Sequence, residues 1–215
     1  MMVLVACSDS ENLQPGQGIR FDALEVGQIS RYEVFTGTGY RTSDSSTVSY
    51  AGGVLVAEIV DEENAGFVVH EYFDSPPTVS SAVEQRLQLD QTYIYTVRVE
   101  DEVLKVEASG DELRSRLLRP MPDLPLIDVA SPQTELLGWK TKLPYCECYR
   151  EAFVADAAVR DHSYPRLNVL ITNEMMQADG PGTTYIYSAD DGLVRSVEYS
   201  WWTGEGVGFD RIAEE

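Results

Sequence analysis

The chain is poor in basic residues. Of its 215 residues, 16 are Lys or Arg against 36 Asp or Glu, which gives a formal net charge of -20. The lysines are Lys105, Lys140 and Lys142. A surface of this sign repels nucleic acid and an anionic membrane surface, so we predict no nucleic-acid partner. We interpret the acidity as a source of solubility or an adaptation to salty surroundings, and an acidic site for cations or basic partners is the alternative.

Long hydrophobic runs are also missing. No stretch of 18 apolar residues occurs, so the sequence predicts no transmembrane helix. Hydrophobic residues nevertheless make up 43% of the 215 positions. A chain of this length and composition can bury a core as a single all-β domain. Internal repeats and low-complexity tracts are absent as well.

Motifs for nucleophilic, metal or nucleotide chemistry are absent. There is no Gly-x-Ser-x-Gly elbow, His-Glu-x-x-His, Walker loop or dinucleotide fingerprint. The two histidines are His70, mid-strand on the side of Val68 and Tyr72, and His162 in Asp161-His162-Ser163. We interpret His70 as structural, and neighbours in sequence rarely face one another as a triad requires. We therefore predict no catalytic residue, cofactor or metal.

Carboxylates are the only residues of the sequence that suggest an enzymatic function. Three acidic clusters, Asp61-Glu62-Glu63, Glu100-Asp101-Glu102 and Asp190-Asp191, fall in predicted turns. Solvated carboxylates are expected there, and the spacing of an EF-hand is missing. The alternative function is a secreted hydrolase whose carboxylates converge only in the fold, because a glycosidase needs two of them close together.

The chain has three cysteines, and two of them form a Cys-x-Cys pair. In a strand, Cys146 and Cys148 point to the same face with Cα atoms roughly 6.6 Å apart, at the edge of disulfide geometry. A turn there would allow a disulfide in an oxidising compartment. Two separate buried thiols are the second alternative. A soft-metal site that adds His162 or Met175 and Met176 is a third and weaker one.

Alternation with period two dominates the rest of the chain and predicts strands with one buried face. In residues 92–100, Tyr93, Tyr95, Val97 and Val99 share one side. Turn residues join such runs into three hairpins. These connect Val54–Val60 to Phe67–Phe73, the tyrosine strand to Val103–Ala108, and Thr183–Tyr187 to Leu193–Trp201, the last with Gly192 at the left-handed position of a bulged turn.

Consecutive hairpins predict the fold class: an all-β or β-rich α+β protein with one strongly curved antiparallel meander sheet, a half-barrel, and one or two short helices. Helices are expected around Val79–Leu89 and Asp111–Leu118, the second ending before Pro120. Residues 119–138 hold four prolines and are expected to form an extended crossing loop.

The concave face of such a sheet is a candidate site for an apolar ligand. It would carry Tyr93, Tyr95 and Trp201, although the same residues would also form an ordinary core. On 193–202, Leu193, Val197, Tyr199 and Trp201 share the expected core side, and Trp202 lies opposite. Trp202 is expected either beneath the crossing loop or in contact with a ligand.

The start of the chain resembles the lipobox of bacterial lipoproteins. Leu4-Val5-Ala6 precede Cys7, and the polar run Ser8-Asp9-Ser10-Glu11-Asn12 follows it. In that family the cysteine is acylated after cleavage, which implies lipid attachment at Cys7. Residues 1–6 would be a truncated signal remnant, 7–20 the anchor and a flexible tether, and 21–215 one β-rich domain. An ordinary cysteine near a frayed terminus is the alternative.

Both ends of the domain resemble uncharacterised bacterial envelope lipoproteins. The resemblance lies in Phe21-Asp22-Ala23-Leu24-Glu25-Val26-Gly27, followed by Tyr32, and in Tyr187-Ser188-Ala189-Asp190-Asp191-Gly192-Leu193-Val194-Arg195. It implies a curved-sheet protein like the LolA/LolB carriers of acyl chains. The expected function is that of a non-enzymatic, lipid-anchored envelope lipoprotein, periplasmic or on the outer membrane. Its partners would be the membrane, through acylated Cys7, and an apolar small molecule or an envelope protein.

Overall fold

The structure is a computed structural model of the 215-residue chain. It describes residues 24–38, 48–64, 66–100, 103–108, 115–118, 123–125, 141–143, 146–173, 181–188, 191–200 and 205–213. The predicted signal remnant and tether, residues 1–20, lie outside these ranges, and so do Trp201 and Trp202.

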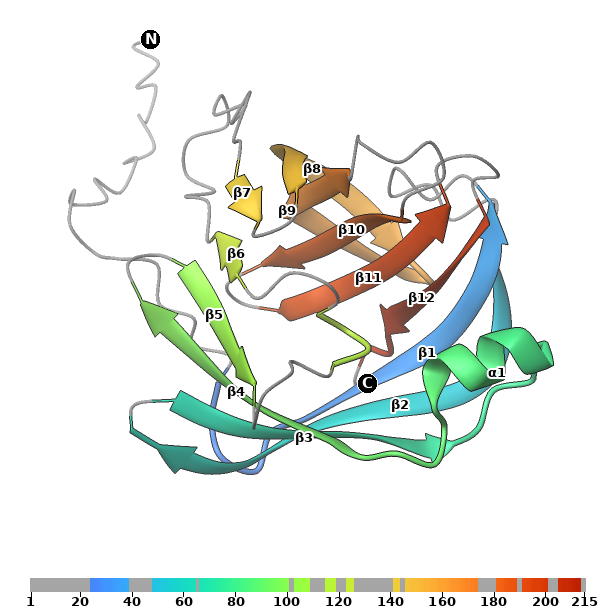
Figure 1. The fold of residues 1–215 in the computed structure, drawn as a ribbon, viewed down its shortest axis with the longest axis horizontal. Coiled ribbons are helices and arrows are strands. Elements are labelled where there is room, and N and C mark those ends of the chain that lie inside the picture. The colour runs from blue at the N-terminus through green and yellow to red at the C-terminus, as the bar shows by residue number, and fades with distance from the viewer. Residues whose placement is uncertain are drawn as a thin grey trace, which may run out of the picture.

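The described residues form a 12-stranded antiparallel sheet and one short helix (Figure 1). The strands of the first half are β1 (Ile29–Thr38), β2 (Val48–Glu63), β3 (Gly66–Ser75), β4 (Tyr93–Glu100), β5 (Val103–Ala108) and β6 (Asp123–Pro125). Those of the second half are β7 (Thr141–Leu143), β8 (Cys146–Val159), β9 (His162–Asn173), β10 (Pro181–Ser188), β11 (Gly192–Ser200) and β12 (Glu205–Arg211). The helix α1 (Ser81–Leu87) lies between β3 and β4 in the chain.

Neighbours in sequence are neighbours in the sheet, with one exception. The spatial order is β6-β5-β4-β3-β2-β1-β12-β11-β10-β9-β8-β7, so β1 pairs with β12 in the middle and β6 and β7 form the two edges. The β1–β12 register runs from Tyr32 opposite Arg211 to Thr38 opposite Glu205. The sheet curls, with β1–β5 on one side of a concavity and β9–β12 on the other (Figure 1). The predicted fold class, a curved antiparallel half-barrel with a short helix, is confirmed.

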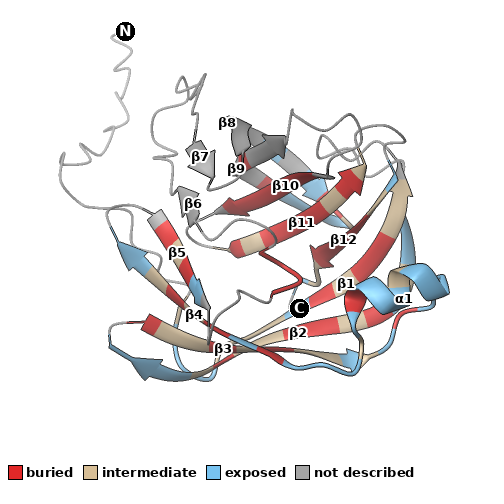
Figure 2. Cartoon of the chain, in the orientation of Figure 1, coloured by how far each residue is buried: buried red, intermediate tan, exposed pale blue. Residues whose placement is uncertain are grey.

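The main core fills the concave side. Inward residues of β1–β5, β10 and β12 pack there with Leu87 of α1 and with Leu117 and Leu118. Buried residues follow β1, β2 and β10–β12, whereas most of α1 and the ends of β2 and β4 are exposed (Figure 2). The residues Ser115–Leu118, which we call the plug, lie inside the concavity.

A second core lies on the outer face of β10 and β11. Val159, Tyr164 and Leu167 from the β8–β9 hairpin pack against Ile186 and Val194. Phe35, Val197 and Tyr199 form a smaller cluster on the same side of the sheet. Because both faces of β10 and β11 are covered, their side chains are buried at nearly every position.

The predicted hairpins occur, with tighter turns than expected. The β2–β3 register continues to Glu63 opposite Gly66, so most of the expected turn Asp61–Gly66 is strand. The β4–β5 register continues to Glu100 opposite Val103. Tyr93, Tyr95 and Val97 are buried as predicted, whereas Val99 is 39% exposed because it lies near the end of this hairpin.

The β10–β11 hairpin confirms the position predicted for Gly192, which has a φ of +68°. A bulge follows, because Ile186 pairs with Arg195 but Tyr187 pairs with Leu193. The extra residue puts Leu193 on the concave side, while Val197 and Tyr199 lie on the outer side. The prediction that Leu193, Val197 and Tyr199 share one side is therefore wrong, since strict alternation does not anticipate a bulge.

One of the two expected helices is found. Helix α1 lies within the range Val79–Leu89, and its C-cap Gln88 is left-handed with a φ of 49°. The described part of the second range, Ser115–Leu118, consists of bends instead of helix. Buried side-chain partners satisfy the backbone N–H groups of this segment, so it has no need of helical hydrogen bonds.

Candidate functional site

An apolar cavity of about 90 Å³ lies on the concave side, at the end where β1 begins and β12 ends. Most of its wall comes from strands β2–β5, from the plug and from the residues next to β1. The principal apolar lining residues are Leu24, Ile59, Val69, Val97, Leu104 and Leu118. Tyr95, predicted as an apolar ligand contact, lines it too.

One wall of the cavity is polar. Gln28 and Ser30 line it from the start of β1, and Arg211 lines it from the end of β12. Tyr32 lies among them, and its hydroxyl donates to the carbonyl oxygen of Leu193 at 3.1 Å. Burial raises the pKa of the Tyr32 phenol, and the nearby Arg211 guanidinium partly offsets that effect. The positive charge of Arg211 therefore acts at the cavity wall.

The plug is held in place by the buried carboxylate of Glu71 on β3. The Ser115 hydroxyl donates to Glu71 Oε2 at 2.7 Å, and the Arg116 backbone N–H donates to Oε1 at 2.6 Å. The Leu117 N–H and the Tyr95 hydroxyl also donate to Oε2, at 3.4 Å and 3.3 Å. These hydrogen bonds position the next residue, Leu118, which lines the cavity.

Arg116 connects the plug to helix α1. Its guanidinium lies 3.4 Å from Glu71 Oε1, and both side chains are at most 1% exposed. It also donates to the carbonyl oxygens of Leu87 at 2.6 Å, Gln88 at 2.6 Å and Gln91 at 2.8 Å. Leu87 is the last residue of α1 and Gln88 its C-cap, so Arg116 supplies donors to carbonyl groups at the helix end and just beyond it.

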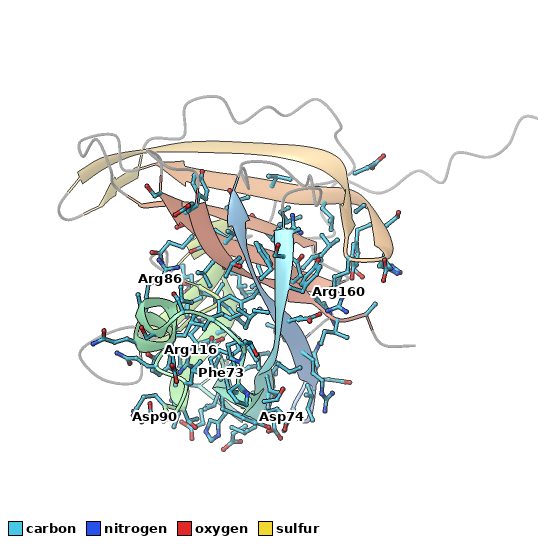
Figure 3. The ribbon with its side chains drawn as sticks, turned by 90° about the vertical axis from the view of Figure 1, so that its right-hand side faces the viewer. Phe73, Asp74, Arg86, Asp90, Arg116 and Arg160 are labelled. Carbon is cyan, nitrogen blue, oxygen red and sulfur yellow. The ribbon has the colours of Figure 1, made fainter. Side chains whose placement is uncertain are left out.

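Aromatic rings complete the surroundings of Arg116. The guanidinium carbon lies 4.0 Å from the centre of the Tyr93 ring and 5.2 Å from that of Phe73. Figure 3 shows Arg116 next to Phe73, below α1. The Tyr93 hydroxyl donates to Gln88 Oε1 at 2.6 Å. Tyr93, the other tyrosine predicted to contact a ligand, is therefore 3% exposed and packs against Arg116.

A wider groove of about 650 Å³ lies at the opposite end of the concavity. Its walls come from α1 and the residues before it, the end of β1 and the start of β12, with Val79, Val83, Arg86 and Val207 among them. Ser200, the last residue of β11, also lines it. Trp201 and Trp202 follow Ser200 directly in the sequence, but they lie outside the described residues, so their predicted ligand contact stays a prediction.

A second buried ion pair lies on the outer side of the sheet. Arg195 on β11 donates to both carboxylate oxygens of Asp210 on β12, at 2.6 Å each, and the Tyr50 hydroxyl donates to Oδ2 at 2.7 Å. Burial and Asp210 together raise the pKa of Tyr50. Arg195 lies 5.1 Å above the Phe35 ring. This cluster lines neither the cavity nor the groove, and we interpret it as structural.

Arg160, in the turn of the β8–β9 hairpin, forms an ion pair with Glu33 and lies 5.2 Å from the Tyr50 ring. In Figure 3 it lies on the other side of β1 and β2 from Arg86 and Arg116. His162 is two residues further on and stacks edge-on with Tyr164, at 4.4 Å between ring centres. These contacts tie the hairpin to the outer face of the sheet.

Cys146 and Cys148 lie at the start of β8, where they pair with Leu143 and Thr141 in a regular register. The backbone there is a strand, which is the case in which the sequence predicts that Cys146 and Cys148 point to the same face. The thiol groups, Met175 and Met176 lie outside the described residues, so the disulfide, the separate thiols and the metal site stay predictions. Cys7 also lies outside them, and its acylation stays a prediction too.

Carboxylates do not gather in a cleft of the described part of the chain. Its two fully buried carboxylates, Glu71 and Asp210, are each paired with an arginine. The described residues contain no cluster of three His, Cys, Asp or Glu placed to bind a metal ion. Within the same residues, α1 is far too short to cross a bilayer, and no longer apolar helix occurs.

Tyr95, one of the residues expected to contact a ligand, lines the cavity, but the residues that organise the site, Glu71, Arg116 and Arg211, were not predicted from the sequence. A signal for Glu71 exists, because it follows Val69 by two positions on a strand and therefore shares its inward side. The partner of this inward charge could not be read from the chain, since Arg116 lies in a segment without periodicity. No protein family, curated protein or solved structure matches this chain.

Proposed function

We propose that the protein is a non-enzymatic, lipid-anchored protein of the bacterial cell envelope that binds an apolar small molecule, or an apolar part of an envelope partner, inside its curved sheet. The observation that carries the binding function is the apolar cavity on the concave side. A sheet that served only as a scaffold would be expected to close its core to native packing density. An apolar space of about 90 Å³ beside a charged side chain supports a ligand site.

The support for the anchor comes from the Cys7 motif. Leu24, which lines the cavity, is the first described residue after the polar segment 7–20. A random coil of that segment's length would separate an acylated Cys7 from the domain by roughly 20 Å. The cavity would then lie within a short distance of the membrane, where apolar ligands are concentrated.

Ligand binding is tested by titrating the purified chain with a fluorescent hydrophobic probe. We expect saturable binding that Ala57→Leu weakens at least severalfold, because Ala57 lines the cavity and the larger side chain fills it. The matched control is Ala158→Leu, an exposed alanine of β8. Binding that is absent, or that both variants leave unchanged, would refute a ligand site in this cavity.

The anchor is tested in bacteria that express the gene from its native upstream sequence with labelled palmitate. We expect label on the wild-type protein and none on Cys7→Ser. Label that survives the substitution, or an unlabelled wild type, contradicts acylation at Cys7. The hydrolase alternative has no comparable support, since no paired carboxylates line the cavity or the groove among the described residues.

A further inference from the structure

The cavity has one apolar side and one polar side. The apolar side comes from β2–β5 and from Leu118 of the plug, and the polar side comes from the start of β1 and the end of β12. Gln28 and Ser30 precede Tyr32 at alternate positions, and Arg211 is the β12 residue opposite Tyr32. Residues in these positions share one face of a sheet. A guest would therefore meet hydrocarbon on one side and polar groups on the other.

The polar side offers the cation of Arg211 and the side-chain amide of Gln28. Gln28 Oε1 is buried and has no hydrogen-bond partner among the described residues. A buried acceptor without a partner is costly to the fold, and a half-turn of this amide would present its NH₂ group, a donor for an anionic head group, to the cavity instead. The Arg211 guanidinium presents several N–H donors in one plane, a geometry that suits carboxylate and phosphate groups.

The volume restricts the shape of the guest. An apolar cavity of roughly 150 Å³ holds a benzene ring in another protein, and the space here is about 90 Å³. It therefore suits a narrow, unbranched hydrocarbon chain better than a ring or a lipid with several chains. Leu24 and Leu118 form part of its wall from outside the strands.

We propose that the ligand is an anionic amphiphile with one unbranched hydrocarbon chain, whose head group binds Arg211 and whose chain enters the apolar side of the cavity. This rests on the proposed ligand-binding function and narrows it to a chemical class. A carboxylate and a monoester phosphate share the required charge, and the experiment separates them from a neutral head group on the same chain.

The test compares decanoate, decyl phosphate and decan-1-ol by calorimetric titration of the full chain at about pH 8, where the carboxylate is ionised. We expect at least one of the two anions to bind about tenfold or more tightly than the alcohol. Shortening the chain should weaken binding by roughly fourfold for each methylene that the cavity encloses. Further methylenes that no longer fit should add little.

Arg211→Gln is the decisive variant. It should weaken the preferred anion by about tenfold or more, because a hydrogen-bonded charge pair is lost, and leave the alcohol unchanged. The matched control is Arg31→Gln, which removes the same charge from an exposed position on β1 and should leave both affinities unchanged. A thermal unfolding curve for each variant identifies any loss of fold.

The outcomes separate this inference from the function on which it rests. If the alcohol and both anions bind equally, or if Arg211→Gln weakens the alcohol as much as the preferred anion, the anionic head group is refuted while apolar binding stands. If none of the three compounds binds, and the hydrophobic probe does not bind either, the proposed ligand-binding function fails together with the inference.

Discussion

Glu71 is a charged residue at an inward position of a strand, where alternation favours an apolar side chain. Its carboxylate is fully buried and accepts hydrogen bonds from Ser115, from the Arg116 and Leu117 backbone and from Tyr95. A buried carboxylate is tolerated only when it is paired and hydrogen-bonded. The charge at this position therefore specifies where the plug lies, and an apolar residue could not hold the same N–H groups.

Removing the cation of this pair should strongly destabilise the fold. We expect Arg116→Met to lower the free energy of unfolding by about 3–5 kcal/mol, because it leaves Glu71 without its counter-charge and the end of α1 without its donors. Urea unfolding measures the change.

The matched control is Arg98→Met. Arg98 forms an exposed ion pair with Glu107, with side chains 34% and 50% exposed, so the loss should be about 0–1 kcal/mol. Equal losses in the two variants would contradict a structural role for the buried pair.

At the scale of elements, the centre of the sheet depends on close packing between β1, β12 and β11. Gly208 on β12 lies opposite Phe35 on β1, and a Cβ atom at Gly208 would overlap the Phe35 ring. Gly206 has no room for a Cβ atom either, since the backbone carbonyl oxygen of Glu198 is 2.5 Å away. Glycine at these two positions lets the aromatic ring and the neighbouring strand approach.

We expect Gly208→Ala to lower the free energy of unfolding by about 1–3 kcal/mol, because the added methyl group forces the Phe35 ring out of its place. In the Phe35→Leu background, Gly208→Ala should lower the free energy of unfolding by less than it does in the wild type, because the smaller leucine side chain leaves room for the methyl group. A double-mutant cycle in urea measures the coupling. Strictly additive losses would show that the ring and the methyl group do not meet.

At the scale of the whole molecule, buried tyrosines make stability depend on alkaline pH. Burial raises the pKa of Tyr32, Tyr95 and Tyr187 above the ordinary value of 10.0. In the unfolded chain these phenols ionise near pH 10, while in the folded protein they keep their protons. The contribution of these protonated tyrosines to the free energy of unfolding is therefore fully present below pH 10 and is lost as the pH rises above it.

We expect the urea concentration at the unfolding midpoint to decrease as the pH rises from about 9 to about 11. The decrease should begin near the pKa of a free phenol. Tyr187→Phe removes one titrating group, so its midpoint should fall less steeply over that range. Denaturation curves at several pH values, with tyrosinate absorbance followed in parallel, measure both effects. A variant that shows the same slope as the wild type would contradict the contribution of Tyr187.

The overall fold could be predicted from the sequence because period-two alternation and turn residues are local signals. Tyr93, Tyr95 and Val97 on β4 and Gly192 at the β10–β11 turn follow directly from them. The candidate site could not be predicted in the same way. Tyr32 pairs with Arg211 from the other end of the chain. No local sequence pattern predicts pairing between strands so far apart in the sequence.

The same pairing of β1 with β12 sets a condition on folding. The hairpins from β1 to β5 can close through local turns, whereas the partner of the β1 edge lies near the other end of the chain, so that edge has no neighbour until β12 pairs with it. Such an edge presents unpaired N–H and C=O groups that can pair with a strand of another chain. We therefore expect refolding yields to fall as the protein concentration rises, because chains in which β12 has not yet paired can aggregate through this edge.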